Sequence, residues 1–197
     1  MRSRCAFHPS LSGKPVALAR LEGWRWFICD RGYANVFLPG EMRWGRYGEQ
    51  GDGEGEIPAS VCEGEVDGGD VVYGVLYEMA RDDERLLDGY EGVDWESAPA
   101  DAQGKVSPDV RPREQGSGDY NKWYLPARVT KWLDDEQRVL RREKEEQTVL
   151  VYVDEKGVRV GPPKREYIAR MERGIREAEE LGFPSKWATQ VMRRVLQ

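Results

Sequence analysis

The chain has 197 residues, of which 39% are hydrophobic and 34% are charged, so it can bury the core of one compact domain. Its net charge of -6 argues against nucleic acid and anionic membranes as main partners, because both favour a basic face. No apolar run approaches the roughly 20 residues of a membrane span. The three cysteines, Cys5, Cys29 and Cys62, lack metal-ligand or disulfide-framework spacing and predict free thiols in the cytoplasm.

The first third of the chain predicts short strands followed by a polar insertion. Apolar and aromatic residues from 16 to 36 are interrupted at Gly23 and at 30–32, which predicts three strands joined by tight turns and favours a small barrel. Residues 39–69 are rich in glycine and acidic residues, and we expect them to form an irregular insertion.

The central segment predicts a strand that leads into a helix. Residues 71–79 are almost continuously apolar, as in a strand covered on both faces. A helix over 82–90 should follow, with Asp82 and Asp83 capping its exposed amides and complementing its dipole. The inward face of this helix should carry the apolar side chains Leu86, Leu87 and Tyr90.

Irregular structure, two strands and a helical hairpin should complete the domain. Residues 94–119 hold several prolines and glycines and predict a long excursion, and strands are expected near 122–132 and 148–153. The charged stretch between those strands predicts an exposed hairpin or short helix. After 164 the chain predicts a helix that stops at Gly182 and a second helix that starts at Pro184, with Trp187, Val191 and Val195 on its inner side.

Four sequence blocks resemble the gamma-glutamylcyclotransferase-like family, and two of them, WYLPARV at 123–129 and VLVYV at 149–153, stand where the family has its later barrel strands. The strand VVYGVLY at 71–77, its helix and LDGYEGV at 87–93 are similar to the family's strand, helix and L-D-x-x-E-G-V motif, whose Glu is the catalytic acid/base. The stretch GWRWFI at 23–28 with RGYANV at 31–36 resembles fungal-type members. The resemblance implies an α+β fold over residues 1–197: one domain with a small mixed β-barrel, flanking helices, insertions at 39–69 and 94–119, and a helical extension at 164–197.

The resemblance assigns the site residues. It places the catalytic acid/base at Glu91, which we expect to be buried with a raised pKa, and substrate-lining hydroxyls at Tyr124 and Tyr152. Asn35 and Tyr33 could face the same opening, although an Asn in such a turn often satisfies its own backbone.

The implied reaction closes a gamma-glutamyl compound to 5-oxoproline and releases an amino acid. The substrate supplies its own nucleophile, the α-amino group, so one carboxyl can perform both proton transfers. His8 is the only histidine, which removes the usual zinc and Ser-His-Asp arrangements. We therefore expect a small-molecule gamma-glutamyl substrate and no metal or cofactor.

One departure from the family leaves alternatives open. Members open with a strand and a Y-G-S-N loop that holds the glutamyl group, and this chain has no match to that loop, as if it began one strand late. The strand at 16–21 or at 71–79 would then have an unpaired edge, which invites aggregation or a homodimer. The alternatives are a non-catalytic relative that has lost the loop, and an enzyme acting on gamma-glutamylamines or glutathione.

Overall fold

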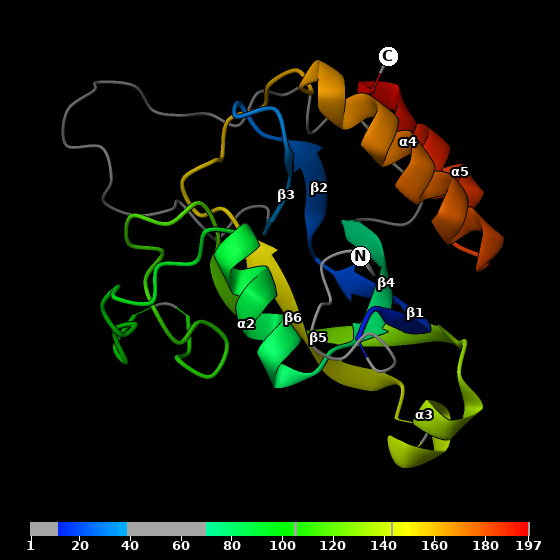
Figure 1. The fold of residues 1–197 in the computed structure, drawn as a ribbon, viewed down its shortest axis with the longest axis horizontal. Coiled ribbons are helices and arrows are strands. Elements are labelled where there is room, and N and C mark those ends of the chain that lie inside the picture. The colour runs from blue at the N-terminus through cyan, green and yellow to red at the C-terminus, as the bar shows by residue number, and fades with distance from the viewer. Residues whose placement is uncertain (1–11, 39–69, 105, 143, 197) are drawn as a thin grey trace. The chain divides into compact units, whose positions relative to one another are not determined.

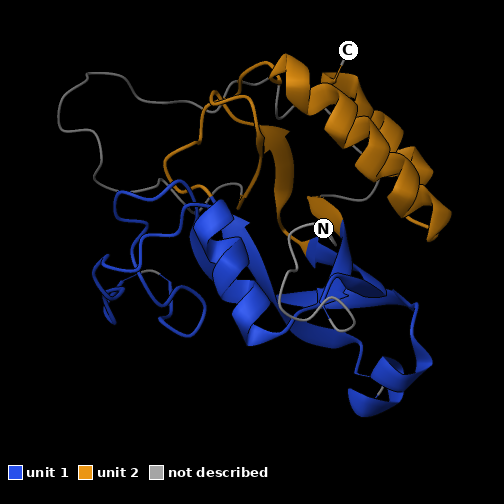
Figure 2. Cartoon of the chain, in the orientation of Figure 1, with its two compact units in different colours: residues 1–21, 74–153 blue, residues 22–73, 154–197 orange. Residues whose placement is uncertain are grey.

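The structure is a computed structural model that describes residues 12–38, 70–104, 106–142 and 144–196. It confirms a mixed α+β architecture with antiparallel strand pairing. The chain divides into two compact units, one formed by residues 1–21 and 74–153 and the other by 22–73 and 154–197 (Figure 2). The expected insertion at 39–69, together with Cys5, Cys62 and His8, lies outside the described residues.

The larger sheet contains four strands in the order β4-β1-β5-β6 (Figure 1). They span Lys14–Glu22 (β1), Val71–Glu78 (β4), Asn121–Trp132 (β5) and Glu146–Val153 (β6). Four consecutive residues of β1, 16–19, are buried, as expected for an interior strand. Each of these strands was predicted from its apolar pattern, and each boundary lies within two residues of the prediction or extends it slightly.

The described strands do not close into the predicted small barrel. Strands β2 (Arg25–Ile28) and β3 (Ala34–Phe37) pair with each other in a separate two-stranded sheet. The four-stranded sheet has β4 at one edge and β6 at the other, so the hydrogen-bonded ladder does not close among the described residues. Among the described strands β1 lies between β4 and β5, so of the two expected edges it is β4 that stands at the edge of this sheet.

The predicted helix forms as α2 (Arg81–Tyr90), but its ends differ from expectation. The residue at its N-cap is Ala80, whose side chain makes no capping hydrogen bond, so Asp82 and Asp83 do not cap it. They stand in the first turn, where their charge complements the helix dipole. The prediction that the side chain lies on the inward face of the helix is confirmed for Leu87, which is buried, and is wrong for Tyr90, which is 60% exposed.

The rest of the first unit follows the predicted pattern. Residues 94–119 contain turns and one isolated bridge between Pro99 and Arg113, with no helix or strand among the residues described there. The charged stretch after β5 forms the short helix α3 (Asp135–Leu140), and the side chain of Asp134 caps it by accepting the backbone N–H of Gln137 at 2.9 Å. The prediction of an exposed short helix is confirmed.

The second unit contains the β2–β3 hairpin and the C-terminal helices. Helix α4 (Arg165–Glu180) ends at the left-handed Gly182, as predicted. A short α-helix, α5 (Ser185–Trp187), then passes into a π-helical turn (Ala188–Met192) and a 3-10 turn (Arg193–Val195). The second helix is therefore less regular than expected; Trp187 is buried, whereas Val195 is 38% exposed and does not belong to its inner side.

Each unit has its own apolar interior. In the first unit, side chains of β1 and β5 are buried together with Leu87 of α2. In the second unit, the rings of Tyr73, Phe183 and Trp187 meet edge to face, with centroids 5.6 to 6.4 Å apart. Phe27 and Phe37 make a similar edge contact across the β2–β3 hairpin.

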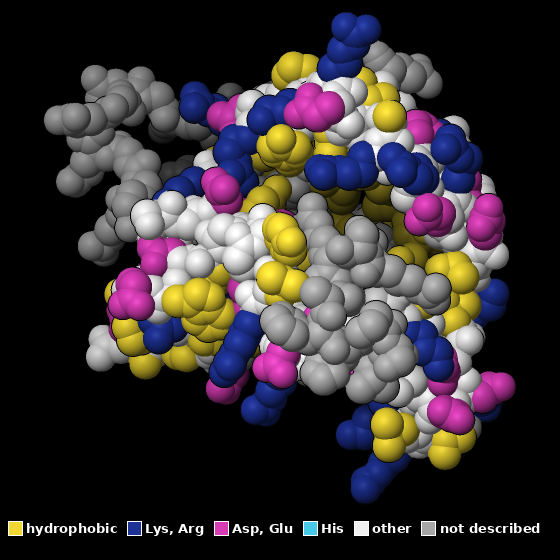
Figure 3. All heavy atoms as spheres, viewed as in Figure 1, with side chains coloured by type: hydrophobic (Ala, Val, Ile, Leu, Met, Phe, Trp, Pro, Cys, Tyr) yellow, Lys and Arg dark blue, Asp and Glu magenta, His cyan; other side chains and the backbone are white. Residues whose placement is uncertain are grey.

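On the face seen in Figure 3, acidic and basic side chains are interspersed.

Candidate functional site

A polar cluster lies between α2 and the strands β5 and β6 of the first unit. Asp88 of α2 has no exposed surface, and its Oδ1 accepts a hydrogen bond of 2.6 Å from the Tyr152 hydroxyl. The ammonium of Lys122 lies 3.1 Å from Oδ1 and 3.2 Å from Oδ2 of the same carboxylate. The polar groups satisfy one another, as buried polar groups must.

Strand register explains why Lys122 and Tyr152 meet. In the β5–β6 pair these two residues stand directly opposite each other, and side chains of directly opposite residues lie on the same face of the sheet. Both side chains reach Asp88, so the face that carries them is the one covered by this part of α2. Residues two positions along a strand share a face, so Tyr124 belongs to the same face as Lys122.

Lys122 is held as a cation by groups on three sides. Its Nζ contacts Oε1 of Glu84 as well as Asp88, and it lies 5.3 Å from the centre of the Trp95 ring. Burial lowers the pKa of Lys122, but the hydrogen bonds to Glu84 and Asp88 more than offset this and leave it raised. The cluster thus contains one firmly charged ammonium and two nearby carboxylates.

Tyr152 stays protonated in this environment. Burial is the main reason that its pKa is raised, followed by the hydrogen bond to Asp88 and then by the charges of Asp88, Glu84 and Glu91. The Glu91 carboxylate therefore lies within electrostatic reach of the Tyr152 hydroxyl. A phenol of this kind can donate or accept hydrogen bonds, but it gives up its proton poorly, so too little phenolate forms to act as a base.

Glu91 stands at the C-cap of α2, where its backbone N–H donates to the carbonyls of Leu87 and Gly89. The next residue, Gly92, has φ +66°, and Val93 N–H closes on the Asp88 carbonyl at 2.9 Å. These bonds form a Schellman motif, which fixes the direction in which the chain leaves the helix. Glu91 itself is half-buried, so the expectation of a fully buried carboxylate is wrong. The expectation that its pKa is raised stays a prediction.

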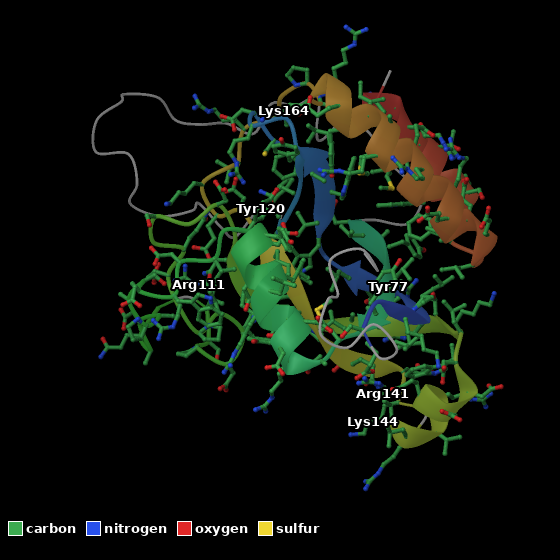
Figure 4. All side chains as sticks on the ribbon, viewed as in Figure 1. Tyr77, Arg111, Tyr120, Arg141, Lys144 and Lys164 are labelled. Atoms are coloured by element: carbon green, nitrogen blue, oxygen red, sulfur yellow. The ribbon has the colours of Figure 1, made fainter. Side chains whose placement is uncertain are left out.

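The loop after α2 also supports the end of β5. The backbone N–H of Tyr124 donates to the carbonyl of Val110 at 2.7 Å, and Tyr124 is half-buried. Arg111, labelled in Figure 4, lies 6.0 Å from the centre of the Trp123 ring and pairs with Glu114 at 2.7 Å. The first unit therefore carries three of the predicted site residues, and the β5–β6 register places two of them, Tyr124 and Tyr152, on one face of its sheet.

The other two predicted residues, Asn35 and Tyr33, belong to the second unit. Asn35 is buried and its amide is fully used: Nδ2 donates to the carbonyls of Asp154 and Gly157, and Oδ1 accepts from two backbone N–H groups. An Asn amide has two donor hydrogens and two acceptor lone pairs, so no capacity is left for a substrate. Only the bond from the Val36 N–H is local, whereas the other three join Asn35 to the distant segment 154–157, so Asn35 has a structural role that neither expectation described.

Tyr33 packs against the start of α4. Its ring meets the Tyr167 ring edge to face at 5.3 Å, and its hydroxyl accepts a hydrogen bond of 3.2 Å from Lys164. Lys164 is labelled in Figure 4. Lys164 also lies 4.4 Å from the centre of the Tyr33 ring. These contacts give Tyr33 a packing role within the second unit.

Sequence reasoning missed Asp88, Lys122, Glu84 and Trp95. The available signal was a lysine opposite a tyrosine in two adjacent predicted strands, together with the Asp of the L-D-x-x-E-G-V motif. Among the described residues, no group of three or more His, Cys, Asp and Glu side chains is arranged to hold a metal ion. None of the described helices has the length and apolar character to cross a membrane.

Comparisons with protein-family models, with curated proteins and with solved structures found no match for this chain.

Proposed function

We propose that the chain cyclises gamma-glutamyl compounds to 5-oxoproline with release of an amino acid, and that Glu91 is the general acid/base. The observation that carries the proposal is the division of roles within residues 87–93. Leu87 and Asp88 are buried and Gly92 makes the turn, whereas Glu91 is half-buried at the C-cap, three residues after the aspartate that binds Tyr152. The motif thus leaves one carboxyl in reach of both solvent and a buried polar face.

The chemistry needs few protein groups. The substrate α-amino nitrogen attacks its own γ-carbonyl carbon, a new C–N bond closes the five-membered ring, and the old amide C–N bond breaks. Glu91 takes one proton from the α-ammonium, which frees the lone pair that attacks, and the second proton that the ring nitrogen loses passes to the departing nitrogen. The two protons lost by the ring nitrogen end on the released amine, so no net proton is consumed. Holding the two reacting groups in one molecule contributes about 7–11 kcal/mol in well-oriented cases. General acid/base catalysis adds about 10²- to 10⁴-fold.

Three kinds of leaving group are compatible with this proposal: an amino acid, another amine, or the cysteinylglycine of glutathione. A non-catalytic protein with the same fold is the alternative from a different functional class. Incubating the chain with gamma-glutamyl-alanine, a gamma-glutamylamine and glutathione, and quantifying 5-oxoproline and each released amine, separates these cases. No 5-oxoproline from any of them would favour the non-catalytic alternative.

The decisive variant is Glu91→Gln, which keeps the side-chain shape and removes the proton relay. We expect turnover to fall by about 10²- to 10⁴-fold while the fold is retained. Glu96→Gln is the matched control, because Glu96 is exposed and lies five residues away on the same loop. Turnover of Glu91→Gln equal to that of the control would remove Glu91 from the mechanism.

A further inference from the structure

The hydroxyl proton of Tyr152 is already committed. A phenol has one O–H to donate, and Tyr152 gives it to Oδ1 of Asp88 at 2.6 Å. Asp88 cannot turn away, because the Lys122 ammonium binds both of its oxygens and the residue has no exposed surface. What the Tyr152 oxygen can still offer a ligand is its lone pairs, so it acts toward that ligand as a hydrogen-bond acceptor.

The surrounding charges favour the same kind of ligand. Asp88 accepts the Tyr152 hydroxyl, Glu84 shares the Lys122 ammonium with Asp88, and Glu91 follows Asp88 by three residues at the end of α2. The charges of all three carboxylates act on the Tyr152 hydroxyl. The Lys122 ammonium, which is held by Glu84 and Asp88, offsets only one of these three negative charges. A cation placed against the Tyr152 oxygen would be stabilised there, whereas a developing oxyanion would be repelled.

We infer that Tyr152 is the acceptor for the substrate α-ammonium, which it holds next to Glu91, and that Asp88 is the positioning residue that sets the direction of its hydroxyl. The inference rests on the proposed function and deepens it, because it assigns the recognition of the nucleophile. It also places the nitrogen that must lose a proton beside the carboxyl that accepts it. Tyr152 is accordingly a specificity residue for a free α-amino group and contributes nothing to the oxyanion.

The test compares two ligands that differ only in that group: gamma-glutamyl-alanine and N-glutaryl-alanine, in which hydrogen replaces the α-ammonium. Calorimetry is performed in the Glu91→Gln background, so that turnover is slow and the Glu91 charge does not contribute. A charge-assisted hydrogen bond corresponds to about 10- to 100-fold in affinity. We expect gamma-glutamyl-alanine to bind more tightly by that factor.

Adding Tyr152→Phe should remove most of this preference and leave the affinity for N-glutaryl-alanine unchanged. Tyr77→Phe is the matched control, since Tyr77 is an exposed tyrosine of β4 in the same unit. If Tyr152 had only a structural role, Tyr152→Phe would lower the affinity for both ligands equally, and this result would overturn the inference. Loss of turnover with the ligand preference intact would make Tyr152 an oxyanion donor and would also overturn it.

The outcomes separate the inference from the proposed function. Production of 5-oxoproline by the unmodified chain, with Tyr152→Phe retaining the ligand preference, sinks the inference alone. Selective binding of gamma-glutamyl-alanine without any 5-oxoproline sinks the function alone, and binding of neither ligand sinks both. If Tyr152→Phe does not fold, a crystal structure of Glu91→Gln with gamma-glutamyl-alanine decides. The α-nitrogen should lie within hydrogen-bond distance of the Tyr152 oxygen, and a carbonyl oxygen there would contradict the inference.

Discussion

Two glycines of the motif, Gly89 and Gly92, should respond to the same substitution in opposite directions. Gly89 lies inside α2 with an ordinary backbone conformation, and a methyl group added there would meet nothing within 4 Å. Gly92 has φ +66°, and a methyl group there would lie 3.1 Å from both Cβ and Oδ2 of Asp119. The two positions are three residues apart and flank Glu91, so each serves as the control for the other.

The magnitudes follow from these surroundings. Alanine is favoured over glycine in a helix interior by roughly 0.5–1 kcal/mol, so Gly89→Ala should stabilise the unit by up to that amount. A non-glycine residue in the left-handed region costs roughly 1–2 kcal/mol, and the close contact with Asp119 adds to this cost. Gly92→Ala should therefore destabilise by at least about 1–2 kcal/mol, and the two variants should differ by about 1.5–3 kcal/mol.

The assay is urea unfolding followed by circular dichroism, supported by hydrogen exchange at the Val93 amide, which donates to the Asp88 carbonyl across the turn. Exchange of that amide should slow in Gly89→Ala and accelerate in Gly92→Ala. Equal destabilisation by both substitutions, or a neutral Gly92→Ala, would show that α2 does not end in the described Schellman motif. In that case this motif would not be what positions Glu91.

Two further predictions concern charged groups of the first unit. Lys122→Met should lower the free energy of unfolding measured in urea by about 3–5 kcal/mol, because it leaves Asp88 buried without its cation. Adding Asp88→Asn should restore part of this loss. A double variant no more stable than Lys122→Met would contradict the pairing of Lys122 with Asp88. Hydrogen bonds from the Ser117 backbone and hydroxyl hold the pKa of Asp94 below its usual value. Their contribution to the free energy of unfolding is therefore complete when the pH is above the usual Asp pKa, and it is lost as the pH falls through the lowered pKa. The Ser117 amide resonance should titrate with a midpoint below the ordinary Asp range, and Asp94→Asn should abolish that titration.

Local patterns were sufficient to predict most of the elements but not how the strands associate. The six strands, α2 and α4 each coincide with a segment whose apolar periodicity or glycine punctuation marks it. Strand association depends on hydrogen bonds between distant segments, such as the pairing of Ala17 with Trp132, which no local pattern encodes. The closed barrel was inferred from short strands in succession, and that signal is equally compatible with two open sheets.

The site shows the same limit. Glu91 is proposed as a site residue because a short motif marks it, and the position of the turn after it follows from Gly92. Asp88 was overlooked because an aspartate within a helix is ordinarily exposed. Its burial is explained only by partners 34 and 64 residues away, Lys122 and Tyr152. Tyr90 was assigned inward from helical spacing alone, yet the last turn of α2 exposes it.

The spacing between Asp88 and Glu91 has a mechanical reason in this structure. Asp88 contributes its side chain to the buried cluster and its backbone carbonyl to the turn, where it accepts the Val93 N–H. Glu91 occupies the C-cap between these two anchors, so its backbone is fixed at both ends. One residue more or less between them would move the left-handed position away from Gly92 and rotate Glu91 by about 100° around the helix axis. The three-residue interval therefore ties the carboxyl proposed for proton transfer to the carboxylate that orders Tyr152.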